Sequence, residues 1–202
     1  MSNPSPLFPG QFYHIYNRGN NRENIFVEER NYAYFMSLYT RYIEPVADTY
    51  AYCLLRNHFH LLVRIKTLEE SPSQDGHVKA PSQHFSNFFN AYARTINQTY
   101  GRTGALFQRP FGRVLVRSQS HLFHLVMYIH RNPQIHGFVE DYGDWPYSSY
   151  PEIKDLTDFW KSVRSLRRED VLAWFSGVEG FVRSHREEMQ GKEINYLVEE
   201  DM

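Results

Sequence analysis

Two histidines stand two positions apart within an apolar segment. Residues 54–63 read LLRNHFHLLV, with His58 and His60 on either side of Phe59. Side chains at i and i+2 of a β-strand point to the same side, so a strand over 58–66 places both imidazoles on one face. Neutral imidazole nitrogens bind divalent metals. A bare His-x-His pair is more often two polar residues on an outer face, so a metal site needs further residues.

The alternation in this segment separates two faces. The odd-numbered positions are all apolar: Phe59, Leu61, Val63 and Ile65. The even-numbered positions carry the polar side chains and one leucine: His58, His60, Leu62, Arg64 and Lys66. This pattern predicts that one face of the strand lies in the core and that the other presents two imidazoles followed by two cations.

A second polar group lies on a predicted helix over about 119–132. On a helical wheel, Leu122, Leu125, Val126 and Ile129 form an apolar stripe, and His121, His124, Tyr128 and Asn132 form a polar stripe beside it. Tyr128 and Asn132 stand one turn apart, so the helix can present a phenol and an amide oxygen at one place. Taken singly, Tyr128 would be a core aromatic residue and Asn132 a helix cap.

The charge distribution suits a phosphate-binding surface. Residues 76–139 contain seven Lys and Arg and no Asp or Glu, whereas residues 140–202 contain eight Lys and Arg against 15 Asp and Glu. A basic stretch without carboxylates is suited to binding phosphates, although the acidic tail could equally neutralise its positive charge. Two imidazoles, a phenol, an amide oxygen and a basic surround are together the parts of a phosphoryl-transfer site.

Length and composition exclude several other classes of protein. The chain has 202 residues, 42% of them hydrophobic, which is consistent with one domain or one domain with an appended piece. Cys53 is the only cysteine, which excludes an internal disulfide framework and a multi-cysteine zinc site. The sequence has no membrane-length apolar run and no signal-peptide pattern at its start, so we expect a soluble cytoplasmic protein.

The predicted elements alternate in type. Periodicity and turn signals predict strands over 11–18, 48–56, 58–66 and 111–116, helices over about 28–43, 83–100 and 119–132, a polar loop over 67–83, and short amphipathic helices after residue 134. Pro133 should close the third helix. Adjacent early strands favour an α+β fold with an antiparallel sheet.

Several motifs, in this order, resemble a known family. They are the 54–63 block, YHIYNRGN at 13–20, the segment from YGRTG to FQRPF at 100–111, and YIHRNP at 128–133. Together they are similar to the single-tyrosine HUH transposases (His, bulky apolar residue, His), in particular the REP-associated, insertion-sequence-like branch. Arg56 stands where the family commonly has Pro, and the acidic tail is unlike the basic tails of some relatives.

The resemblance implies a fold and a domain organisation. We expect a ferredoxin-like or RRM-like antiparallel sheet with helices packed on it as the catalytic domain in residues 1–140. Residues 141–202 would form a short, acidic, helical C-terminal extension packed on that core.

The resemblance also implies a reaction. The protein would be a metal-dependent transposase and endonuclease that cleaves and rejoins single-stranded DNA through a 5′-phosphotyrosine. Tyr128 would be the nucleophile, and His58, His60 and Asn132 would bind Mg²⁺ or Mn²⁺. His121 and His124 would lie around the metal-binding residues and help to position them. The substrate would be hairpin-bearing or repeat-derived DNA in the bacterial cytoplasm or nucleoid, with no membrane partner and with a homodimer as one expected form.

Arginines of the basic stretch and its neighbourhood are the candidate DNA contacts. They are Arg18, Arg94, Arg102, Arg109, Arg113 and Arg117. Two alternatives stay open at this point. One is an HUH nickase of the replication-initiator or relaxase type, although Tyr128 lies 68 residues after His60 (128 − 60) and no helicase follows. The other is a domesticated module that binds DNA or RNA without cutting it.

Overall fold

A computed structural model describes residues 5–71, 80–155 and 163–187. Its strands are β1 (Phe12–Arg18), β2 (Ala47–Leu55), β3 (His58–Ile65) and β4 (Gly112–Leu115). Its α-helices are α1 (Glu29–Tyr42), α2 (Pro81–Thr99), α3 (Gln119–Ile135), α4 (Tyr150–Asp155), α5 (Arg168–Trp174) and α6 (Val178–Arg186). Two short 3-10 turns, Asn20–Arg22 and Tyr142–Asp144, complete the set.

The four strands form one antiparallel sheet in the order β2-β3-β1-β4. With α1 after β1 and α2 after β3, the chain order is β-α-β-β-α-β, which is the ferredoxin-like arrangement. The predicted fold class is therefore confirmed. The central strands are β3 and β1, and β4 is a short edge strand.

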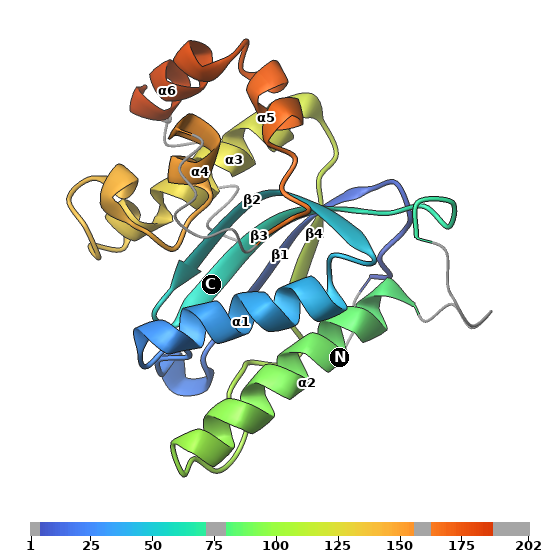
Figure 1. The fold of residues 1–202 in the computed structure, drawn as a ribbon, viewed down its shortest axis with the longest axis vertical. Helices are drawn as coiled ribbons and strands as arrows, with labels where there is room; N and C mark the ends of the chain where they lie inside the picture. Colours follow the sequence, from blue (N-terminus) through green and yellow to red (C-terminus); the bar gives the residue numbers. More distant parts are fainter. Residues whose placement is uncertain (1–4, 72–79, 156–162, 188–202) are drawn as a thin grey trace.

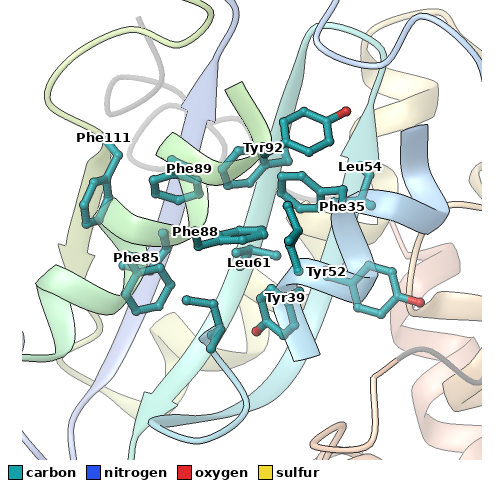
Figure 2. Packing of buried hydrophobic residues seen from close by; sticks show 14 of the residues in the cluster. Phe35, Tyr39, Tyr52, Leu54, Leu61, Phe85, Phe88, Phe89, Tyr92 and Phe111 are labelled. Carbon is teal, nitrogen blue, oxygen red and sulfur yellow. The ribbon is translucent and has the colours of Figure 1, made fainter. Parts of the chain in front are cut away.

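Helices cover both faces of the sheet (Figure 1). Helices α1 and α2 lie on one face, and α3 with α4, α5 and α6 lies on the other. The first face is packed with aromatic rings, among them Phe35, Phe85 and Phe88, as Figure 2 shows. The second is packed around Leu62 of β3 and Leu125 of α3. The alternation predicted for the histidine strand is thus present, but both of its faces are buried.

The helices form where their apolar stripes predict. Phe85, Phe88 and Tyr92 of α2 are completely buried against α1 and the sheet. Helix α3 starts as predicted, because the Ser118 hydroxyl accepts a hydrogen bond from the His121 N–H at 3.1 Å.

The predicted start of α2 and the predicted end of α3 were wrong, and each lies at a proline. Helix α2 begins at Pro81 rather than at 83, because proline is tolerated in the first turn, where its missing N–H would have no partner. Helix α3 continues through Pro133 to Ile135. The predicted polar loop ends earlier than expected for the same reason, and its residues 72–79 lie outside the described ranges.

The segment after α3 adds an edge to the sheet. Beside β2, the Leu54 N–H donates to the Tyr147 carbonyl at 2.8 Å and the Ser149 N–H donates to the Tyr52 carbonyl at 3.0 Å. The Trp145 indole donates to the Leu54 carbonyl at 3.0 Å. The described residues beyond 140 therefore pack on the sheet and on α3, while the predicted boundary at 140 stays a prediction. In these described ranges, no helix is long and apolar enough to cross a membrane.

A chain of buried hydrogen bonds ties α6 to α3. His185 Nδ1 donates to the Phe181 carbonyl at 2.8 Å, so its Nε2 accepts from His130 Nδ1 at 2.8 Å. His130 Nε2 then accepts from the Ser149 hydroxyl at 2.7 Å. This polarity requires both imidazoles to be neutral. Burial lowers the pKa of His185 to about 4 and lowers that of His130 well below its usual range.

This network predicts a loss of stability in acid. Because the pKa of His185 is lower in the folded chain than the ordinary value near 6.5, its contribution is present above pH ~6.5 and falls as the pH drops toward about 4. The full shift corresponds to up to about 3 kcal/mol. Urea unfolding at pH 7 and pH 4.5 measures it. We expect a smaller difference between the two pH values for His185→Gln than for the wild type, and equal differences would contradict the assignment.

Candidate active site

The two predicted histidines lie side by side on the sheet face that α3 covers. His58 and His60 of β3 are 4% and 2% exposed, and their ring centroids are 5.1 Å apart. Strand β1 runs antiparallel beside them, with Arg18 opposite His58 and Tyr16 opposite His60. Because partners in register share a face, β1 contributes its own side chains to the same place.

His14 of β1 is the nearest of these neighbours. Its Nε2 lies 3.0 Å from His60 Nδ1, and the two rings are stacked with centroids 5.2 Å apart. Either ring can donate, depending on the tautomer. If His60 Nδ1 donates to His14, the lone pair of His60 is on Nε2, which is the tautomer that could bind a metal.

The tautomer of His58 is set by its neighbour in the β2–β3 turn. His58 Nδ1 lies 2.7 Å from the Asn57 side-chain oxygen, which can only accept, so Nδ1 carries the proton. The lone pair of the neutral ring is then on Nε2. Asn57 thereby holds His58 in the form and orientation that metal binding requires.

Helix α3 brings Asn132 to His58. The Asn132 Nδ2 donates to the Tyr128 carbonyl at 3.1 Å, one turn back along the helix, which leaves Oδ1 as the oxygen that the side chain presents. The amide faces His58, and it raises the pKa of that imidazole against the larger lowering by burial. Even so, Asn132 Oδ1 and His58 Nε2 are both buried without a hydrogen bond of normal geometry.

Tyr128 reaches the same cluster from α3. Its ring centroid lies 5.6 Å from that of His60 and 6.3 Å from that of His14, in edge-to-face contacts. The structure therefore brings together all four residues predicted for the centre: His58, His60, Tyr128 and Asn132. The side chain of Tyr128 is only 1% exposed, so its ring is enclosed between α3 and the sheet.

The electrostatics keep the histidines neutral. Burial, together with the nearby imidazoles and Arg18, lowers the pKa of His58 to about 2, and burial with His136 and Arg18 lowers that of His60 to about 3. A neutral imidazole has a lone pair for a metal, whereas a protonated one has none. The low pKa values of the two buried histidines thus favour the neutral, metal-binding form at neutral pH.

The donor set fits a divalent cation. Within the described ranges, no three His, Cys, Asp or Glu side chains are grouped so that they could hold a metal ion. The donors would instead be two imidazole nitrogens and the Asn132 amide oxygen. The unpaired Nε2 of His58 and Oδ1 of Asn132, which face each other, are what such a site needs.

A second tyrosine borders the cluster. The Tyr16 ring lies 4.9 Å from the His14 ring and 6.2 Å from the His60 ring, and it is half-buried. It covers the backbone of Gly112 in β4, where a Cβ atom would lie 2.2 Å from the ring. Glycine at 112 therefore allows Tyr16 to lie flat between the histidines and the edge of the sheet.

The residues that contact the two central imidazoles include three that were not predicted. His121 and His124 lie in the first two turns of α3, and His124 Nδ1 is 3.3 Å from the Ser120 hydroxyl. His14 and Asn57 instead hold the two central imidazoles, and His136 lies near them, with its ring 4.8 Å from that of His58. The signal for His14 was available in the sequence, because it alternates with Ile15 in the first predicted strand.

The predicted DNA-contacting arginines occupy different environments. Arg94, Arg109 and Arg117 are exposed, and Arg18 is half-buried beside the histidines. Arg102 forms an ion pair with Glu23. Arg113 is half-buried, with its guanidinium 3.9 Å from the centre of the Phe111 ring.

Comparison with known proteins supports the motif resemblance. No family model matches the chain. A Haemophilus influenzae protein named as a REP-associated tyrosine transposase is 33% identical over 106 residues, which are 51% of this chain and 58% of that protein. A solved structure of a REP-associated tyrosine transposase bound to a REP hairpin superposes with a TM-score of 0.56 at 17% identity, over 79% of this chain and 88% of the other. The resemblance is confirmed in sequence over half of the chain, and the second match confirms the fold.

The donor geometry predicts metal-dependent stabilisation. Mn²⁺ at about 100 times its dissociation constant should stabilise the fold by ~2.7 kcal/mol, or about 5–10 °C in Tm. We expect His60→Ala to abolish this shift and Asn132→Ala to reduce it, since the second variant keeps both imidazoles. His84→Ala, on α2 at the other face, is the control and should retain the shift. A full shift in His60→Ala would rule out this metal site.

Proposed function

From its resemblance to REP-associated tyrosine transposases, we propose that this chain cleaves and rejoins single-stranded DNA through a covalent bond to Tyr128. The observation that carries the proposal is the meeting of β3 and α3. Two neutral imidazoles, an amide oxygen and a phenol from segments 68 residues apart lie within one buried cluster.

The metal-binding residues would be His58, His60 and Asn132. A bound Mg²⁺ or Mn²⁺ would supply Lewis-acid polarisation of the scissile phosphate. Two nitrogens and one neutral oxygen leave coordination positions for phosphate and water. The role of Asn57 and His14 is to hold the two imidazoles in place through their Nδ1 atoms.

Tyr128 would perform the covalent step. Its oxygen attacks phosphorus, a P–O bond forms to the tyrosine, and the bond from phosphorus to the 3′ oxygen breaks, which releases a 3′-OH. A free tyrosine has a pKa of ~10, so the phenol proton must leave as the bond forms. The phosphotyrosine conserves the energy of the broken linkage. A second 3′-OH can therefore reverse the step and join a new strand without ATP.

The burial of Tyr128 adds a requirement to this mechanism. A phosphodiester cannot reach a phenol that is 1% exposed, so α3 has to shift or its side chain has to rotate before attack. Helix α3 is held on its far side by the bond between His130 and His185. The structure described here is therefore the closed form of the site in this proposal.

The substrate proposed is single-stranded DNA that carries a hairpin. The solved relative is bound to a REP hairpin, and residues 76–139 of this chain have seven cations and no carboxylate. Exposed Arg94, Arg109 and Arg117 are available for phosphates. Binding should weaken steeply with salt, as it does when several phosphate contacts release counterions.

A binding module without activity is the main competing function. Such a module would keep the fold and the basic stretch, but it would not need the cluster of His58, His60, Tyr128 and Asn132. The neutral, oriented His58 and the presented Asn132 oxygen favour an enzyme, because burying unpaired polar atoms costs stability that a binding module would have no reason to retain.

The role of Tyr128 as the nucleophile can be tested by removing a single atom. Tyr128→Phe removes only the phenol oxygen and keeps the ring packed against His60 and His14. We expect loss of the covalent protein–DNA product with single-strand affinity within about twofold of wild type. The measurement is a gel shift of denatured protein with hairpin DNA labelled on the 5′-phosphate side of the nick, with Mn²⁺ present.

Tyr16→Phe is the matched control, since Tyr16 borders the same histidines. It should still form the covalent product. Wild-type levels of covalent product in Tyr128→Phe would overturn the nucleophile assignment. Binding without any cleavage by the wild type, at every divalent metal tried, would favour the non-cleaving module.

A further inference from the structure

A cavity of about 560 Å³ lies on the sheet face opposite the histidines. Helix α2 and the segment 106–111 border it, and Asn17 of β1 lines it from the sheet. Asn17 alternates with Tyr16 and Arg18, which are on the histidine face, and it follows Tyr13 and Ile15, which belong to the core beneath α1 and α2. The cavity is therefore distinct from the proposed active site.

Aromatic rings form one wall of this cavity. Phe89, Phe107 and Phe111 line it, and Phe89 lies 5.6 Å from Phe107 and 5.1 Å from Phe111 between ring centroids. Figure 2 shows Phe89 and Phe111 at one end of the aromatic layer. The three phenylalanines are 6–7% exposed, so they offer an apolar wall that a planar heterocycle could contact through the exposed parts of the rings.

Polar groups complete the lining. Asn17 Oδ1 accepts from the Arg18 N–H at 2.8 Å, so its Nδ2 is the group turned to other partners. Asn90 and Gln108 are exposed at the rim and can both donate and accept. Among the described residues that line the cavity, none is acidic. The lining thus combines an aromatic wall with amide groups and positive charge.

Arg113 supplies a positive charge without a carboxylate partner in the described ranges. Its guanidinium lies over Phe111 at 3.9 Å, and its Nη1 donates a long hydrogen bond of 3.4 Å to the Ser5 carbonyl. The buried Nε has no hydrogen-bond partner. A half-buried guanidinium placed against an aromatic ring and lacking an anion is suited to an anionic aromatic ligand.

The cavity is linked to the active-site end of β1. The Gln108 N–H donates to the Arg18 carbonyl at 2.9 Å, and Phe107 forms a β-bridge with Gly19. Arg18 is the register partner of His58. Strand β4, only four residues long, separates the two faces at this edge of the sheet.

We infer that this cavity binds one unpaired nucleotide of the DNA strand, with the base against the phenylalanine wall and the phosphate at Arg113. The inference rests on the proposed function and adds to it a second contact that selects the position of the strand. The volume suits a nucleobase with its sugar, since ligand sites of 300–1,000 Å³ are usual. Amides at the rim would read the base edge, as they do in other single-strand sites.

The test measures which nucleotide the cavity holds. Fluorescence anisotropy gives the affinity of the full-length protein for a DNA hairpin with single-stranded flanks. The measurement is repeated with a series of DNAs in which one flanking base at a time is removed, which leaves an abasic site at that position. For the wild type we expect one abasic position to weaken binding about tenfold, the usual effect of losing one stacked base. Tyr128→Phe should show the same position-specific loss, because the cavity is remote from the phenol.

Two variants connect that nucleotide to the cavity. Ala93→Trp, on a lining residue of α2, fills the space, and Arg113→Gln removes the charge. Both should weaken binding of the intact DNA about tenfold and should abolish the extra loss at the sensitive abasic position. Arg41→Gln is the matched control, because Arg41 lies on α1, is exposed and does not line the cavity. It should keep the position-specific loss.

The outcomes separate this inference from the proposed function. The wild type could bind and cleave the DNA while Ala93→Trp and Arg113→Gln leave the effect of every abasic position unchanged. That result would overturn the nucleotide site and leave the proposed function standing. Absence of any single-strand binding by the wild type would overturn both. Melting curves check that Ala93→Trp is folded, and Arg113→Gln provides the same comparison if it is not.

Discussion

The structure depends on the alternation of side chains along β3, with both faces of that strand buried. One face is apolar and packs against α1 and α2 through residues such as Phe59. The other face must accommodate two imidazoles under α3, where polar groups are costly to bury. The fold meets this cost by keeping the rings neutral and by giving each of them a fixed partner, Asn57 for His58 and His14 for His60. The same arrangement leaves the rings in the form that binds metals.

Helix α3 connects the proposed active site to the C-terminal helix α6. On one side it contributes Tyr128 and Asn132, and within the same turns His130 points to the opposite side and bonds to His185 and Ser149. The position of the proposed nucleophile is therefore coupled to the packing of α6. A shift of α3 that exposes Tyr128 would have to strain or rearrange this contact, which gives the helical extension a physical connection to the proposed reaction.

Much of this could be predicted from local patterns. Period-two alternation placed His58 and His60 on one face, and the wheel of 119–132 placed Tyr128 beside Asn132, because both patterns follow from backbone geometry alone. The end of α3 could not be predicted in the same way, since a proline ordinarily ends a helix, whereas α3 continues past Pro133 to Ile135. The His14–His60 contact depends on which strands are neighbours and in what register. The His130–His185 bond spans 55 residues and depends on how α6 packs, which no local pattern contains.

The most direct measurement is the identification of the residue that carries DNA. The protein is incubated with hairpin DNA and Mn²⁺, the covalent product is digested with protease and nuclease, and mass spectrometry locates the nucleotide on the peptides. The chain has 15 tyrosines, and Tyr16 lies almost as close to His60 as Tyr128 does. The account predicts a nucleotide phosphate on Tyr128 and on no other tyrosine. A nucleotide on Tyr16, or cleaved DNA with no modified tyrosine, would contradict it.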